Sequence, residues 1–174
     1  MAVSFINNAS IAAGAGISTS KLGAGSVLQV VSTIKTNLFS YNGSGYQDVT
    51  GLSAVITPTS ASSKILILAS IVYATANTTY GTLCGLRVKR NSTLVGIGGE
   101  DFSSGTASVT AADNQSSYAT VPIMFLDSPS SVSALTYQIQ IAQRVGGSQT
   151  MYVNGAMSSG NTGSSSITVM EIAA

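Results

Sequence analysis

The sequence predicts an all-β fold, a single β-sandwich or jelly-roll domain with an extended amino-terminal arm. Short runs rich in β-branched residues alternate along most of the chain, Gly, Ser and Asn separate these runs, and helical periodicity is almost absent. With 174 residues the chain is long enough for one domain with a substantial core and too short for two. We therefore expect an arm over residues 1–26 and the β-domain over residues 27–174.

Nine runs have the character of strands. They are Val27–Lys35, Asp48–Thr57, Lys64–Ala74, Leu83–Arg90, Thr93–Ile97, Ser117–Leu126, Leu135–Arg144, Thr150–Asn154 and Ser166–Ile172. This many short strands in about 150 residues is typical of a two-sheet sandwich or a jelly roll.

Alternation predicts which side chains face the core. In the run Leu83–Arg90, period-2 alternation places Leu86 and Val88 on the inward side and Arg87 on the outward side. The run Leu135–Arg144 alternates in the same way. Cys84 falls on the inward side with Leu86, so we interpret it as a small buried hydrophobe.

Three features position individual strands. The run Lys64–Ala74 is apolar on both faces, so it is either central in the sandwich or buried against another subunit. Asn91 and Ser92 separate two strand-like runs and predict a tight hairpin, because Asn tolerates the left-handed conformation. Pro122 cannot donate a backbone hydrogen bond, so its strand is expected at an edge or a bulge.

The first 26 residues have a different character. From Asn7 to Ser26 the chain is mostly Ala, Gly and Ser, with isolated apolar residues at Ile11, Ile17 and Leu22. Such a segment cannot bury enough apolar surface to offset its conformational entropy. It predicts an attachment arm ordered by a partner, with Ile11, Ile17 and Leu22 as docking residues; the alternative is a flexible leader.

Charge and hydropathy exclude several partners. Charged residues make up only 7% of the chain and the net charge is +1, so uncharged polar residues must cover the surface. That composition suits a β-structure packed against neighbours in a large assembly. Without an extended basic cluster, capture of nucleic acid is not expected. The longest apolar stretch, Ile65–Ala76, is too short to cross a bilayer, and the amino terminus lacks the features of a secretory signal.

The usual residues of catalysis are scarce. The chain has no histidine, which excludes Ser-His-Asp and Cys-His arrangements and the commonest zinc ligand. The carboxylates are scattered, apart from the adjacent pair Glu100 and Asp101, which supplies too few ligands for Ca²⁺. We therefore expect no enzyme activity, no cofactor and no metal site.

Loop residues are the candidates for outward contacts. Loops at the ends of a sandwich commonly carry function, and a tyrosine offers contact area with a polar tip. On this basis we select Tyr41, Asn42, Tyr46, Tyr80 and Asp101.

Four segments resemble a known family. They are ISTSKLGAGSVLQVV at Ile17–Val31, DVTGLSAVITP at Asp48–Pro58, SSKILI at Ser62–Ile67 and ITVMEI at Ile167–Ile172. The first three resemble the start of the carboxy-terminal domain of bacteriophage tail-fibre proteins, and the fourth resembles its last strand.

The resemblance implies a homotrimer on the surface of a phage particle that binds a host surface structure such as a glycan. Since the amino terminus lacks a secretory signal, we expect a protein made in the bacterial cytoplasm. In a fibre the arm would attach to a baseplate or tail protein, and in a decoration protein to the major capsid protein. Two alternatives stay open. One is a head decoration (cement) protein that clamps the capsid, and the other is a carbohydrate-binding module.

Overall fold

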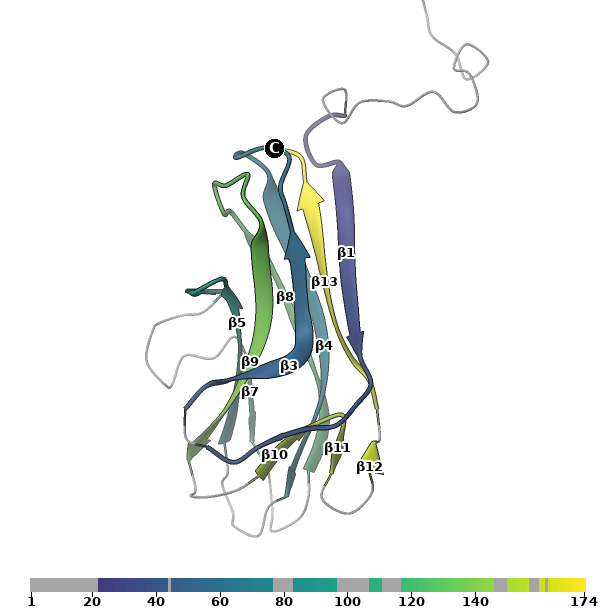
Figure 1. Ribbon diagram of the computed structural model, residues 1–174, viewed down its shortest axis with the longest axis vertical. Helices are drawn as coiled ribbons and strands as arrows, with labels where there is room; N and C mark the ends of the chain where they lie inside the picture. Colours follow the sequence, from purple (N-terminus) through teal and green to yellow (C-terminus); the bar gives the residue numbers. More distant parts are fainter. Residues whose placement is uncertain are drawn as a thin grey trace, which may run out of the picture.

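The computed structural model describes residues 22–43, 45–76, 83–96, 107–110, 117–145, 150–156, 160–161 and 163–174 (Figure 1). Within these residues there are thirteen strands and no helix, which confirms the all-β prediction. The strands are β1 Val27–Lys35, β2 Phe39–Tyr41, β3 Gln47–Ile56, β4 Lys64–Ala76, β5 Leu83–Arg90, β6 Thr93–Val95, β7 Ala107–Thr110, β8 Ser117–Asp127, β9 Leu135–Val145, β10 Thr150–Val153, β11 Gly155–Ala156, β12 Gly160–Asn161 and β13 Ser165–Ile172.

One sheet, which we call sheet A, is built around β4. β13 and then β10 pair with one side of β4, and β8 pairs with the other side along nearly its whole length. β1 extends the sheet beyond β13, and β2 extends it beyond β10. Every pairing in the sheet is antiparallel.

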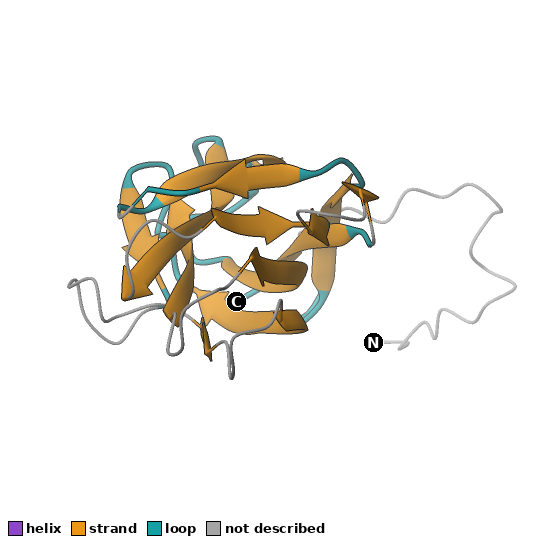
Figure 2. Ribbon diagram, turned by 90° about the horizontal axis from the view of Figure 1, so that it is seen from below, coloured by secondary structure: helices purple, strands orange, loops and turns teal. Residues whose placement is uncertain are grey.

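The second sheet, sheet B, has the order β3-β9-β5, with β6 and β7 both paired to the far side of β5. The chain passes repeatedly between the sheets. As a result, sheet A has the strand order β1-β13-β4-β8, and sheet B has the strand order β3-β9-β5-β7. This interleaved order is that of a jelly roll. Figure 2, which views the molecule from below, shows strands on both sides of the interior.

The interior is apolar and receives alternate residues from both sheets. Its fully buried side chains include Ile65, Ile67, Ile71 and Tyr73 of β4, Ile167 and Val169 of β13, Leu52 and Ile56 of β3, Leu86 and Val88 of β5, and Tyr137, Ile139 and Ile141 of β9. Burial of Leu86 and Val88 confirms the inward face predicted for that strand.

The predicted strand positions are largely confirmed. β1 begins at Val27, as the sequence predicts, and β4 is the central strand of sheet A. Asn91 has a φ of 53° in the turn that joins β5 to β6, as expected for the tight hairpin. β8, which contains Pro122, pairs only with β4 among the described residues and so is an edge strand there.

Several features were not predicted. The sequence does not predict β2, β7, β11 or β12, which are at most four residues long. β3 also contains a bulge between Asp48 and Ser53, where Gly51 has a φ of 78°. The side-chain amide of Gln138 donates to the carbonyl oxygens of Val49 and Leu52 in this bulge, at 2.9 and 3.0 Å. A neighbouring strand thus satisfies backbone groups that the bulge removes from the ladder.

Candidate interaction surface

The side of sheet A that faces away from the core forms a broad apolar surface, which we call the outer face. Residues of β1, β13, β4 and β8 alternate between the core and this surface, because successive side chains of a strand point to opposite sides. The outer face consists of Val30, Ser32, Ile34, Leu66, Leu68, Ser70, Val72, Thr120, Pro122, Met124, Leu126, Ser166, Thr168 and Met170.

Strand register places these residues in rows that cross the sheet. The first row is Val30, Met170, Leu66 and Leu126. The second row is Ser32, Thr168, Leu68 and Met124. Cross-strand neighbours on one face are in side-chain contact range, so the first row, together with Leu68 and Met124 of the second, forms one continuous apolar surface. Hydroxyl residues separate Ile34 from this surface.

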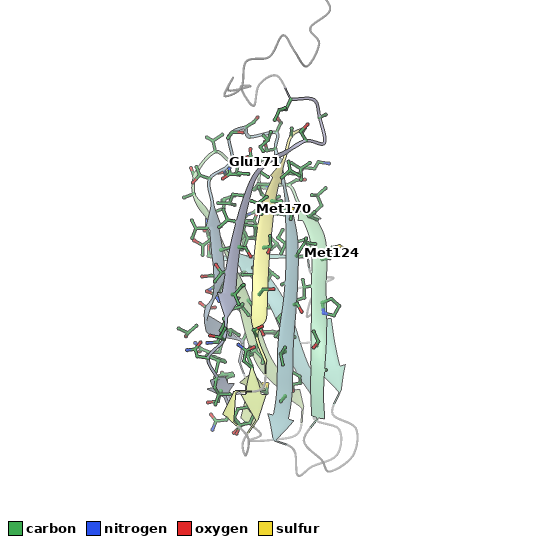
Figure 3. All side chains as sticks on the ribbon, turned by 90° about the vertical axis from the view of Figure 1, so that its right-hand side faces the viewer. Met124, Met170 and Glu171 are labelled. Atoms are coloured by element: carbon green, nitrogen blue, oxygen red, sulfur yellow. The ribbon has the colours of Figure 1, made fainter. Side chains whose placement is uncertain are left out.

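Much of this surface is open to solvent. Met124 is 74% exposed, Ile34 68%, Val30 55% and Leu126 50%. Figure 3 looks onto the outer face, with Met170 of β13 and Met124 of β8 labelled. Single exposed apolar residues are ordinary, but a contiguous exposed patch marks an interaction site.

The polar atoms of the outer face are hydroxyls, and two of them pair with each other. Ser32 Oγ and Thr168 Oγ1 lie 2.9 Å apart and form a cross-strand hydrogen bond. Beside them is a shallow depression of about 270 Å³, whose lining includes Leu68, Pro122 and Met124. At the centre of the outer face, the surface is therefore uncharged and slightly concave.

The outward side of sheet B has the opposite character. Lys89 Nζ lies 2.7 Å from Asp48 Oδ2, and Gln140 Nε2 donates to Asp48 Oδ1 at 2.6 Å. Arg87 Nε donates to Gln140 Oε1 at 2.8 Å, and the Arg87 guanidinium stacks on the ring of Tyr46, 3.6 Å from its centroid. These five residues form a continuous polar ladder across β5, β3 and β9.

The electrostatics of Asp48 follow from this ladder. Burial by itself would raise the pKa of Asp48, but the hydrogen bonds from Lys89 and Gln140 outweigh it and hold the pKa below its ordinary value. Asp48 is therefore an ionised partner within the ladder.

A second carboxylate, Glu171, is completely buried at the end of β13 (Figure 3). Gln29 Nε2 donates to Glu171 Oε2 at 2.6 Å, and Thr59 donates to Oε1 from both its backbone N–H and its hydroxyl, each at 2.7 Å. Burial alone would raise the pKa of Glu171, but these hydrogen bonds outweigh burial and lower it. The cluster ties β1, the β3–β4 turn and β13 together beside the point where the arm enters.

The described carboxylates thus have structural partners. Asp48 is held by Lys89, Glu171 by Thr59, and Asp127 by both Arg90 and Tyr137. In this part of the chain no three or more His, Cys, Asp or Glu residues gather as metal ligands. Nor does the described part contain a helix long and apolar enough to cross a membrane.

The predicted contact residues have different environments. Tyr41 was expected in a loop, but this is wrong: it lies in β2, where pairing with Met151 of β10 holds it, and packs against the core. Asn42 is exposed, whereas Tyr46 lies under Arg87. The structure therefore places Tyr41 on sheet A and Tyr46 against sheet B. Tyr80 and Asp101 lie outside the described residues.

Of the three predicted docking residues, only Leu22 is described. It is 40% exposed and lines a pocket of about 290 Å³ together with Leu28, Thr59 and the carboxy-terminal residue Ala174. Ile11 and Ile17 lie outside the described residues, so their docking role stays a prediction.

The sequence contained one signal for the outer face. The doubly apolar run Lys64–Ala74 predicted a strand that is central or buried against another subunit, and β4 is central while its outward residues Leu66 and Leu68 are half-buried. Val30 and Met124 were missed, because their place on the same surface depends on which strands are neighbours.

No family model and no curated protein match this chain. A solved structure of the infectious bursal disease virus VP2 subviral particle is 12% identical with a TM-score of 0.46, covering 83% of this chain and 32% of that chain. A structure of the Gx strain of the same virus is 14% identical with a TM-score of 0.39, covering 91% of this chain and 41% of that chain. This chain therefore spans less than half the length of either.

Proposed function

We propose that this protein is a non-enzymatic structural component of a bacteriophage particle: a trimeric, tail-fibre-like surface protein attached by its amino-terminal arm and contacting the host surface. The observation that carries the proposal is the contrast between the two outward sides of the sandwich. The outward side of sheet B carries polar side chains, from Lys89 to Arg87, that bind one another. The outward side of sheet A is the uncharged outer face. A subunit of an assembly needs one side that is stable in contact with water and another side that binds a neighbouring subunit.

The arrangement of the motifs supports the resemblance to tail-fibre domains. Val27–Val31 lies in β1, Lys64–Ile67 in β4 and Ile167–Ile172 in β13, and these three strands are neighbours in sheet A. Gln29 and Glu171, from the first and last of the resembling segments, meet at the buried cluster with Thr59. Segments far apart in the sequence therefore form one structural unit, which explains why they would occur together.

The environment of the acidic groups supports a role in binding and not in catalysis. A general acid or base must reach a substrate, yet the Glu171 carboxylate is wholly buried and Asp127 is engaged by Arg90 and Tyr137. Asp48 is occupied by Lys89 and Gln140. Glu100, Asp101 and Asp113 lie outside the described residues, and the polysaccharide assay below tests them together with the rest of the chain.

Immunogold labelling of purified particles of the phage that encodes this chain tests the proposal. Antibodies against the protein are expected to label the tail or baseplate, with particles lacking the gene product as the control. Labelling spread over the head would support the decoration-protein alternative instead. Particles without label after mild fixation would contradict both virion roles. Incubation with host envelope polysaccharide is expected to release no reducing sugar.

A further inference from the structure

We infer that the outer face of sheet A is the surface through which a second copy of this chain binds. The inference rests on the trimeric assembly proposed above and deepens it, because it names the residues at which the copies meet. It commits to one occupant of the face, another copy of the same chain, on three grounds: the size of the surface, its charge and the character of the opposite side.

The size of the outer face suits an interface. Its four strands, spaced about 4.8 Å apart, make a surface about 20 Å wide, and the stretch from Leu66 to Val72 of β4, at about 3.3 Å per residue, gives a length of about 23 Å. The resulting plane area of about 460 Å² is more than half of the roughly 800 Å² that each partner buries in a standard interface.

The chemistry of the outer face restricts what can cover it. None of its residues is charged, and Lys64 stands beyond its end on β4. A carboxylate or ammonium group placed against Leu68 or Met124 would lose its hydration without gaining a partner. The occupant must therefore be uncharged over this area, and the outer face of another copy meets that condition.

The outward side of sheet B does not meet the requirement that the occupant be uncharged. If copies stacked with the outer face of one against sheet B of the next, Arg87, Lys89 and Asp48 would be buried against apolar residues. Association is thus restricted to contacts between outer faces. Three outer faces turned toward a three-fold axis, with one half of each against the other half of the next, give a closed trimer, whereas stacking of front on back without a closing rotation gives an open filament.

A hydrogen bond within the outer face makes part of it easier to dehydrate. A hydroxyl buried without a hydrogen bond is destabilising, but Ser32 and Thr168 already bond to each other within one copy. A neighbour that covers the second row therefore buries fewer unpaired polar atoms than two separate hydroxyls would leave.

Two valines provide a matched test. Val30 is 55% exposed on the outer face in β1, and Val55 is 53% exposed in β3 on the outward side of sheet B. We would replace each with aspartate and measure the mass of the full chain by light scattering. The wild type and Val55→Asp are expected at three times the 17.5 kDa of one chain, and Val30→Asp at 17.5 kDa.

A second variant guards against misfolding. Met124→Asp, on the opposite edge strand β8, is expected to give the same monomeric mass, with circular dichroism showing that both aspartate variants are folded. If either aspartate variant fails to fold, Val30→Thr and Met124→Thr are used in its place. On serial dilution, both threonine variants are expected to dissociate at a higher protein concentration than the wild type.

Folded outer-face variants that keep the wild-type mass, or threonine variants that dissociate at the wild-type concentration, would overturn the inference. A monomeric wild type would also overturn it, and would leave another virion protein as the occupant of the face. That failure is distinguishable from failure of the proposed function, because particle labelling does not depend on the mass of the isolated protein.

Discussion

The hydroxyl of Tyr137 donates a 2.7 Å hydrogen bond to the carboxylate of Asp127, and so joins β9 of sheet B to the end of β8 in sheet A. Arg90, at the end of β5, bonds to the same carboxylate oxygen. Two residues of one sheet thus hold a single acidic residue of the other. This contact fixes the sheets together where the apolar core ends.

Replacing Tyr137 with phenylalanine tests the strength of this connection. The change keeps the buried ring and removes the hydrogen bond to a charged group, which is worth about 1.5 to 3 kcal/mol. We expect a loss of about that size in the free energy of unfolding, measured by urea denaturation at matched protein concentration. A loss below about 0.5 kcal/mol would mean that Arg90 alone holds Asp127.

The same variant should alter stability at alkaline pH. Burial, together with the hydrogen bond to Asp127, raises the pKa of Tyr137 in the folded protein above its ordinary value. The stabilisation is therefore complete below the unfolded pKa of about 10 and is lost as the pH rises above it. Thermal melting between pH 8 and about 11 should show a smaller decrease for Tyr137→Phe than for the wild type; equal decreases would contradict the assignment.

Glu171→Gln is expected to remove part of the acid sensitivity of the fold. The folded pKa of Glu171 lies below its ordinary value of 4.5, so its contribution is present above that pH and is lost as the pH falls through the folded pKa. At neutral pH the amide, which offers one acceptor oxygen fewer to Thr59 and Gln29, should cost about 1 to 3 kcal/mol. The melting temperature of the variant should change less than that of the wild type from pH 6 to about 3. Parallel curves would show that Glu171 is not responsible.

Alanine substitutions at two glycines distinguish the energetic cost of backbone strain from that of steric conflict. Gly96 and Gly25 both have positive φ angles, 66° and 86°, but a Cβ on Gly96 would lie 2.8 Å from the ring of Phe125, whereas one on Gly25 would meet nothing within 4 Å. Alanine at either site costs about 1 to 2 kcal/mol for the left-handed conformation. At Gly96 a further 1 kcal/mol or more is expected, because the Phe125 ring must move. Similar unfolding energies for Gly96→Ala and Gly25→Ala would show that the ring yields freely.

Removal of most of the arm, residues 1–21, tests how the protein is attached. Gly25 N–H donates to the carbonyl oxygen of Ala173 at 2.8 Å, and Ala173 N–H donates to that of Ser26 at 2.9 Å, so the β-domain already holds the chain at these residues. Deletion of residues 1–21 keeps both contacts and should leave the melting temperature unchanged, while incorporation into particles falls sharply. Normal incorporation would place the attachment surface on the β-domain, and a truncated chain that does not fold would make the arm part of the structure.

Local patterns in the sequence were sufficient for most of the fold. Alternation identified the inward side of Leu86 and Val88, the turn residue Asn91 identified a hairpin, and Pro122 identified an edge strand. These features depend on residues close together in the chain. The strand β2 was missed because its three residues are too few to establish a period.

The candidate surface was less predictable, since it depends on strand order. Lys89 meets Asp48 only because β9 lies between β5 and β3, and Val30 joins Met124 on one surface only because β13 and β4 separate their strands. Neither order follows from the hydrophobic pattern of single strands. The doubly apolar run Lys64–Ala74 showed that a partner or a central position was needed, but not which strands complete the outer face.

The copy number of the protein in purified phage particles tests the central claim most directly. Its stained gel intensity, relative to the major capsid protein and corrected for mass, should correspond to a few tens of copies or fewer and to a multiple of three. This result is expected for a trimeric component of the tail or baseplate. Hundreds of copies per particle would contradict the tail-fibre assignment in favour of a head decoration protein, and absence from the particles would contradict a virion role altogether.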